Sequence, residues 1–124
     1  MNVVDSSGWL EYFAGGPQAR LFAKPIEDTA SLIVPTLSLY EVFKRVLQQR
    51  SDDEALQAVA VMEQGRVVDL DRATALAAAE LSVRHRLPMA DSVMLATARR
   101  ADATLWTLDS DFKGLEGVRC FAKV

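Results

Sequence analysis

The sequence has 124 residues, half of them apolar and a quarter charged, which is the size and balance of one ordinary globular domain. Its net charge of −3 is opposite to that of proteins that bind nucleic acids passively through surplus lysine and arginine. No run approaches the ~20 apolar residues of a membrane span, and the early Asp5 argues against a secretory signal. The lone cysteine, Cys120, precludes an internal disulfide, so we expect a cytoplasmic protein with no membrane contact.

Short apolar runs alternate with helical patterns along the chain. A strand is expected first, then a short helix, and then a second helix that ends before Pro25 because proline interrupts helical hydrogen bonding. The later helices are rich in alanine and other strong helix formers. The expected strands cover 2–4, 32–34, 67–70, 104–108 and 118–121, and the expected helices cover 6–13, 17–23, 37–50, 52–64, 71–86 and 90–101.

This alternation predicts an α/β fold with a central parallel sheet of about five strands and helices on both faces. In such sheets, ligands bind outside the carboxyl ends of the strands. Residues that directly follow strands are therefore the first candidates for a functional site.

Aspartates follow two of the expected strands. Asp5 closes the first strand, Asp109 closes the fourth, and Asp111 comes two residues later. Each one alone is also a typical helix N-cap. Because the carboxyl ends of parallel strands meet at one sheet edge, we expect these carboxylates to converge.

Asp91 lies near the start of a helix, on the same face as Met94, Leu95 and Ala98. That face is expected to be buried, and a buried unpaired carboxylate is costly. The helix dipole offsets only about 0.3–1 kcal/mol of this cost. A bound metal ion explains the residue better.

Glu41 lies off the apolar stripe of its helix, one turn before Lys44 and Arg45. Taken alone, this pattern indicates a solvated glutamate that pairs with Arg45 at i,i+4. Glu41 becomes a site candidate only because the chain also contains the other candidate acids.

A cluster of carboxylates has a clear chemical use. Like charges raise one another's pKa and destabilise the fold unless a cation lies between them. Oxygen ligands suit Mg²⁺ or Mn²⁺ and not zinc, and the only histidine, His85, is more simply placed at a helix C-terminus. Carboxylate-bound Mg²⁺ promotes phosphodiester hydrolysis.

Three sequence blocks carry a family resemblance, the third of them in two parts. They are NVVDSS (2–7), PTLSLYEV (35–42), and LPMADS (87–92) with TLWTLDSDF (104–112). In their order and spacing they resemble the PIN-domain family, and within it the VapC-type toxin ribonucleases of type II toxin–antitoxin systems. The resemblance spans the chain and implies one PIN domain over 1–124.

The resemblance assigns roles to individual residues. It implies an acidic quartet around Mg²⁺ or Mn²⁺, in which one glutamate completes the coordination or positions the attacking water. Asp111 is an auxiliary acid, and Ser6 and Thr107 orient the site. The quartet is Asp5, Glu41, Asp91 and Asp109, of which Asp5, Asp91 and Asp109 are the expected metal ligands.

The resemblance also implies an activity and partners. The activity is metal-dependent endonucleolytic cleavage of single-stranded RNA, which leaves a 3′-hydroxyl and a 5′-phosphate. The partners are a second copy of the chain and a cognate VapB-like antitoxin, whose tail enters the acidic groove. Candidate contacts to RNA phosphates are Lys44, Arg45, Arg84, Arg86, Arg99 and Arg100.

Some alternatives stay open. Trp9, Tyr12 and Phe13 form one helical stripe, which indicates core packing or, second, a partner groove. A PIN-type RNA-processing nuclease or a binding scaffold would share the fold. A receiver-like phosphoacceptor module would use acids at strand ends, here Asp5 with Asp69 and Asp71.

Overall fold

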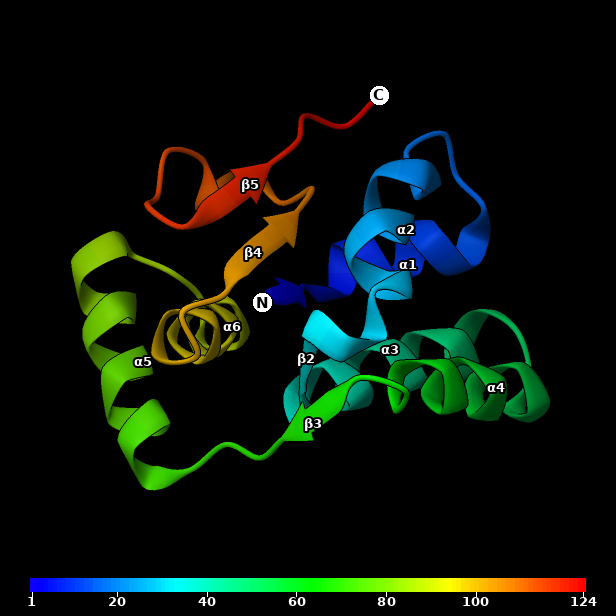
Figure 1. Ribbon diagram of the computed structural model, residues 1–124, viewed down its shortest axis with the longest axis horizontal. Coiled ribbons are helices and arrows are strands. Elements are labelled where there is room, and N and C mark those ends of the chain that lie inside the picture. Colours follow the sequence, from blue (N-terminus) through cyan, green and yellow to red (C-terminus); the bar gives the residue numbers. More distant parts are fainter.

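The computed structural model describes residues 1–124 as a sheet with helices packed on either side (Figure 1). All expected strands are present, and the expected helices other than the second agree with the structure to within two residues at either end. In chain order the elements are β1 (Asn2–Val4), α1 (Ser6–Ala14), α2 (Ala19–Glu27), η1 (Thr29–Ser31), β2 (Leu32–Pro35), α3 (Thr36–Gln49), α4 (Asp52–Met62), β3 (Arg66–Val68), α5 (Arg72–His85), α6 (Met89–Arg100), β4 (Thr104–Thr107), η2 (Ser110–Phe112) and β5 (Val118–Cys120).

The expectation that the second helix ends before Pro25 was wrong. Helix α2 continues through this proline to Glu27, and Phe22, Pro25 and Ile26 are its buried residues. Proline removes one helical hydrogen bond, but here its ring belongs to the apolar face that α2 buries. The prediction considered the lost hydrogen bond and not the gain from burial.

The five strands form one parallel sheet, as predicted, in the order β3-β2-β1-β4-β5. Strand β1 is central, and its residues Asn2 and Val4 lie opposite Thr104 and Trp106 of β4. The first strand therefore pairs with a strand that lies about a hundred residues later in the sequence. Strand β3 is at one edge, with β2 as its only neighbour.

Successive residues of the strands face opposite sides of the sheet and enter two separate cores. Val3, Ile33 and Leu105 belong to the core under α5 and α6, whereas Val4 and Trp106 belong to the core under α1, α2, α3 and α4. Figure 1 shows these two groups of helices on opposite sides of the strands. Helices on both faces are thus confirmed.

The aromatic stripe of α1 serves the second core. Trp9 is fully buried, its ring stacks on Phe13 with 5.6 Å between centroids, and Tyr12 packs against the same cluster. Core packing is therefore confirmed for Trp9, whereas Tyr12 and Phe13 are partly exposed at the edge of this core. None of the helices combines the length and apolar character that crossing a bilayer requires.

Candidate functional site

Acidic residues from four elements surround the carboxyl ends of the central strands. Asp5 follows β1, and its backbone N–H donates to Trp106 O on β4 at 3.1 Å. Asp109 follows β4 two residues after the strand ends. Asp91 is in the first turn of α6, and Glu41 is in the second turn of α3. Parallel pairing of β1 with β4 therefore brings the two strand-end aspartates to one edge, as expected.

Three of these carboxylates have the spacing of a cation site. One carboxylate oxygen from each of Asp91, Asp109 and Asp111 lies within 4.8 Å of the others. Asp111 is exposed, and the other two are partly buried. This all-oxygen donor set fits a hard divalent cation such as Mg²⁺ or Mn²⁺.

Among these acids, Asp91 has a strongly shifted pKa. Burial and, in decreasing order, the negative charges of Asp109, Asp5, Asp111 and Glu41 together raise the pKa of its carboxyl to about 7. The other four predicted acids therefore all act on Asp91 through space. A cation among them would favour the ionised form of Asp91 and offset the repulsion.

Asp5 is buried, with 5% of its surface exposed, and both of its carboxylate oxygens accept hydrogen bonds. Oδ1 accepts from Ser7 Oγ at 2.6 Å and from Gly8 N at 3.2 Å, and Oδ2 accepts from Thr107 Oγ1 at 2.7 Å. Burial raises the pKa of Asp5, whereas these hydrogen bonds lower it. Asp5 is not part of the group of three within 4.8 Å, although its charge reaches Asp91.

Two hydroxyl groups singled out in the sequence hold acids in place. Ser6 Oγ donates to Glu41 Oε1 at 2.5 Å, which places Glu41 against the end of β1. Thr107 Oγ1 donates to Asp5 and accepts from the Asp109 backbone N–H at 2.8 Å. Both residues therefore contact candidate catalytic acids directly.

The helix-cap interpretation of the aspartates is also correct. Asp5 caps α1 through Gly8 N, and Asp109 caps η2 by accepting from Asp111 N at 2.9 Å. An N-cap aspartate places its carboxylate at the positive end of a helix and at the end of the preceding strand. The cap and the site are two roles of the same residues.

Two neighbours of Asp5 were missed in the sequence. Ser7 Oγ accepts from Leu108 N at 3.0 Å in addition to its bond to Asp5. A Cβ at Gly8 would lie 2.6 Å from the Phe22 ring and from Val4 Cγ1, so only glycine lets α1 begin this close to β1. The sequence feature that could have identified Ser7 and Gly8 is their position shortly after Asp5, an aspartate at a strand end.

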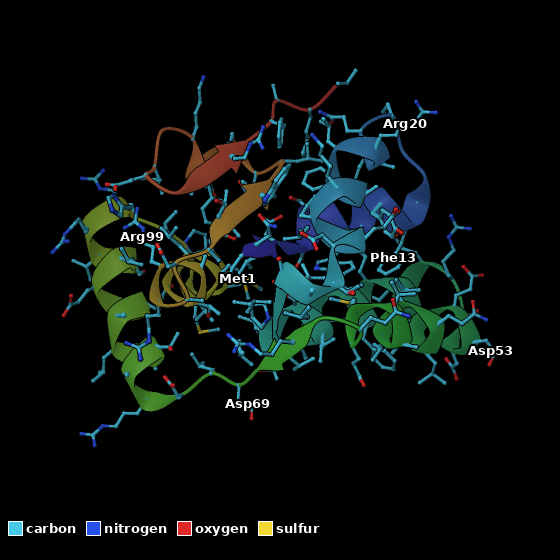
Figure 2. All side chains as sticks on the ribbon, in the orientation of Figure 1. Met1, Phe13, Arg20, Asp53, Asp69 and Arg99 are labelled. Atoms are coloured by element: carbon cyan, nitrogen blue, oxygen red, sulfur yellow. The ribbon has the colours of Figure 1, made fainter.

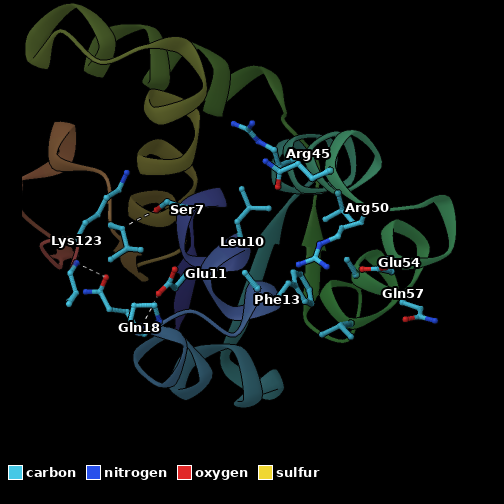
Figure 3. A pocket seen from close by; sticks show the side chains of 18 residues that line it. Ser7, Leu10, Glu11, Phe13, Gln18, Arg45, Arg50, Glu54, Gln57 and Lys123 are labelled. Carbon is cyan, nitrogen blue, oxygen red and sulfur yellow. Dashed lines mark hydrogen bonds between the residues drawn. The ribbon is translucent and has the colours of Figure 1, made fainter.

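A groove of about 990 Å³ begins beside the acidic residues and was not anticipated from the sequence. Ser7 and Leu108 line it, and Figure 3 shows it between α1 on one side and α3 and α4 on the other. Its walls combine apolar side chains, such as Phe13, with charged ones of both signs, which are Arg45, Arg50, Lys123, Glu11 and Glu54. The groove thus presents apolar surface and mixed charge next to the acids.

The cations proposed to contact RNA are distributed unevenly. Of the six, only Arg45 lines this groove. Arg84, Arg99 and Arg100 line a smaller hollow of about 230 Å³ between α5 and α6. The remaining two are Lys44, which lies 5.6 Å from the centre of the Tyr40 ring, and Arg86, which caps α5.

The receiver-like alternative has little support in this geometry. Strand β3 is an edge strand, so Asp69 and Asp71 follow a strand that is two places away from β1. Asp69 projects away from the molecule (Figure 2). Asp71 is exposed and caps α5 by accepting from Thr74 N at 2.8 Å.

Comparisons with known proteins agree with this architecture. The family model for the PIN domain matches residues 3–118. No curated protein matches the chain. A toxin–antitoxin complex from Klebsiella pneumoniae is similar in structure, with a TM-score of 0.86, 17% identity and 100% coverage of both chains.

Two further solved structures have the same fold. VapC20 of Mycobacterium tuberculosis, described as a toxin that cleaves the sarcin–ricin loop, has a TM-score of 0.76 at 18% identity, over 94% of this chain and 95% of its own. DNA-bound VapBC from Salmonella typhimurium has a TM-score of 0.72 at 16% identity, over 97% of this chain and 96% of its own.

Proposed function

Because this chain belongs to the PIN-domain family, we propose that it is a metal-dependent endoribonuclease and the toxin of a VapBC-type toxin–antitoxin pair. In this proposal residues 1–124 act as one PIN domain in the cytoplasm. The observation that carries the proposal is the convergence of Asp91, Asp109 and Asp111 within 4.8 Å. The negative charges of Asp5 and Glu41 also act on Asp91.

The acids divide into roles. Asp91 and Asp109 belong both to the ligand set expected from the sequence and to the geometric group, so we assign them to the metal first. Asp111 offers a third oxygen, and Asp5 is the third ligand of the sequence-based set. When bound there, Mg²⁺ or Mn²⁺ would polarise a phosphate and lower the pKa of a water molecule. Glu41, which accepts a hydrogen bond from Ser6, would orient that water.

We propose single-stranded RNA as the substrate, cleaved to a 3′-hydroxyl and a 5′-phosphate. The fold is shared with VapC20, a toxin that cleaves the sarcin–ricin loop. RNA is usually recognised through unpaired loops, whose bases can be splayed into a site. The cations Arg45, Arg50 and Lys123 beside the acids would offset the repulsion between an acidic protein and a polyanion.

The proposed partners are a cognate antitoxin and, from the family resemblance, a second copy of the chain. Similar structures include toxin–antitoxin complexes from several bacteria. The groove of about 990 Å³ would accept an antitoxin tail that carries apolar and charged residues, because its walls combine apolar side chains with charges of both signs. A tail bound there would reach the acids through the end lined by Ser7 and Leu108.

RNA cleavage by the purified protein tests the nuclease proposal. A mixed pool of single-stranded RNA is incubated with Mg²⁺, with Mn²⁺ or with EDTA, using wild type and Asp91→Asn. Asp53→Asn, on the exposed start of α4, is the control. We expect cleavage that requires metal, is lost in Asp91→Asn and is retained in Asp53→Asn. Cleavage that survives both EDTA and Asp91→Asn would contradict the proposed mechanism.

Co-expression tests the toxin role. A small gene beside the coding sequence is expected to encode a DNA-binding antitoxin. Its product should suppress growth inhibition by the wild-type chain and should copurify with it. Growth inhibition that this product leaves unchanged would favour the alternative of an RNA-processing nuclease outside a toxin–antitoxin pair.

A further inference from the structure

We propose that Ser7 is a positioning residue of the acidic site, which together with Thr107 fixes the Asp5 carboxylate relative to Asp109. The inference rests on the proposed metal-dependent function, because the acids are what Ser7 positions. Ser7 has no assigned role in the acidic quartet or among the residues that orient the site.

The two hydroxyl groups make parallel bridges from Asp5 to the end of β4. Ser7 Oγ donates to Asp5 Oδ1 at 2.6 Å and accepts from Leu108 N at 3.0 Å. Thr107 Oγ1 donates to Asp5 Oδ2 at 2.7 Å and accepts from Asp109 N at 2.8 Å. The two oxygens of one carboxylate are therefore linked, through one hydroxyl each, to two successive amides.

The number of available protons determines which group donates in each of these hydrogen bonds. A hydroxyl group has one proton to donate, and a backbone amide can only donate. Each amide proton goes to a hydroxyl oxygen, so each hydroxyl proton goes to Asp5. The two hydroxyl oxygens lie 3.4 Å apart because both hydroxyl groups approach the same carboxylate. Since each hydroxyl proton goes to Asp5, neither hydroxyl donates to the other. This arrangement suits an ionised Asp5, which accepts only.

Each bridge restrains one oxygen of the carboxylate, and Ser7 supplies the shorter of the two hydrogen bonds to Oδ1, 2.6 Å against 3.2 Å from Gly8 N. The terminal torsion of an aspartate side chain is broad, so a hydrogen bond to one oxygen leaves the other free to swing. A bond to each oxygen restrains that rotation. Because the bridged amides belong to Leu108 and Asp109, the same bonds also link the carboxyl ends of β1 and β4, beside the backbone bond from Asp5 N to Trp106 O.

Helix formation does not explain the contacts of Ser7. Asp5 is the N-cap of α1, and its side chain already accepts from Gly8 N. The Ser7 hydroxyl instead contacts Leu108, which lies 101 residues away in the sequence. Figure 3 shows Ser7 at the end of the groove, with this bond as a dashed line. Its place is held by α1, which packs tightly on β1 at Gly8.

Mn²⁺ binding to the purified protein, measured by calorimetry, tests the proposal. The variants are Ser7→Ala, Ser7→Thr, which keeps the hydroxyl, and Ser82→Ala as the matched control. Ser82 Oγ donates to Leu87 O at 2.7 Å in a partly buried place at the end of α5. We expect Ser7→Ala to weaken Mn²⁺ binding by about 10- to 100-fold, as loss of a residue that orients a metal ligand typically does. Ser7→Thr and Ser82→Ala should bind like wild type.

Amide hydrogen exchange without metal provides a second measurement. In Ser7→Ala the Leu108 amide loses its acceptor and should exchange faster, whereas Ser82→Ala should leave it unchanged. Faster Leu108 exchange with wild-type Mn²⁺ affinity would mean that Ser7 is only structural, and would overturn the proposal. Unchanged exchange would also overturn it, because the bridge would not exist in solution.

A double variant tests whether the two bridges act on one carboxylate. Combining Ser7→Ala with Thr107→Val should reduce Mn²⁺ affinity by less than the product of the two single effects, because both losses loosen the same carboxylate. Fully independent effects would overturn the shared restraint. Failure of the proposed function is distinguishable, since wild type itself would then neither bind Mn²⁺ nor cleave RNA.

Discussion

Asp5 and Asp71 are the same residue in the same local structure, yet their surroundings differ. Each has an extended backbone, with ψ of 175° and 173°, and each caps the helix that follows it by accepting from the third residue on, Gly8 or Thr74. Asp5 is buried, and burial raises its pKa. Asp71 is exposed, and its bonds to Thr74 lower its pKa.

The difference comes from the place of the preceding strand in the sheet. Strand β1 is central, so Asp5 lies beside the end of β4 and near the acids of α3 and α6. Strand β3 is at the edge, so Asp71 has solvent beside it. Local sequence produces the cap, and the strand order decides whether that cap also belongs to a site.

The largest expected effect is a difference in RNA cleavage between variants of these two aspartates. Asparagine caps helices as well as aspartate does, so Asp5→Asn and Asp71→Asn both preserve the helix start. We expect Asp5→Asn to lower kcat/KM for RNA by more than about 100-fold, because loss of an acid at the site exceeds loss of a supporting residue. Asp71→Asn should cleave like wild type. Similar losses in the two variants would mean that the site is not at the end of β1.

Metal binding should produce the next largest effect, seen as thermal stabilisation. A ligand at a hundred times its dissociation constant stabilises the folded state by about 2.7 kcal/mol, so saturating Mn²⁺ should raise Tm. The rise should disappear in Asp109→Asn and persist in Asp71→Asn. Differential scanning calorimetry with and without Mn²⁺ measures both, and a rise that survives in Asp109→Asn would place the metal elsewhere.

The pH dependence of metal-free stability should be smaller. The pKa of Asp91 is about 7 in the folded state and 3.8 in the unfolded reference, so between these values the folded protein holds a proton that the unfolded chain releases. Stability is therefore greatest below pH about 4 for this group and falls as pH rises through 7, by about 1–2 kcal/mol once solvent screening of a half-buried group is allowed for. Urea melts across this range should show a flatter profile for Asp91→Asn.

The smallest effect is expected at Asp71. Asp71→Ala removes the bond to Thr74 N and should lower Tm slightly near neutral pH, whereas Asp71→Asn should not. The pKa of Asp71 is lowered, so its contribution is present above the unfolded pKa and is lost as pH falls through the folded value. Thermal melts at neutral and acid pH measure this, and Mn²⁺ binding should stay unchanged throughout.

Patterns that depend on local periodicity were predictable from the sequence. The strands, the parallel α/β class and the helices on both faces follow from apolar runs and helix formers, and the structure confirms them. The position of α2 was wrong because the burial of Pro25 depends on tertiary packing. The family followed from motif order, which the match over residues 3–118 confirms.

The sequence suggested candidate acids but not their contacts. Asp5, Asp109 and Asp111 were expected to converge because they follow strand ends, whereas Asp91 was singled out by its helix face and joined them through the family resemblance. That Asp111 joins Asp91 and Asp109 whereas Asp5 lies outside their group depends on side-chain positions that spacing does not encode. Sequence spacing likewise suggested Arg45 as the partner of Glu41, whereas the structure brings Ser6 to it from another element. Ser7 and the groove were missed for the same reason.

The pairing of β1 with β4 has a consequence for synthesis of the protein on the ribosome. The central strand β1 is made about a hundred residues before its neighbour β4, which spans Thr104–Thr107, and the acids run from Asp5 to Asp111. A growing polypeptide that has not yet reached Thr104 has no partner for that side of β1 and no bridges from Asp5 to β4. It also lacks Asp109 and Asp111, so the acidic centre is incomplete until β4 and the residues that follow it have been made.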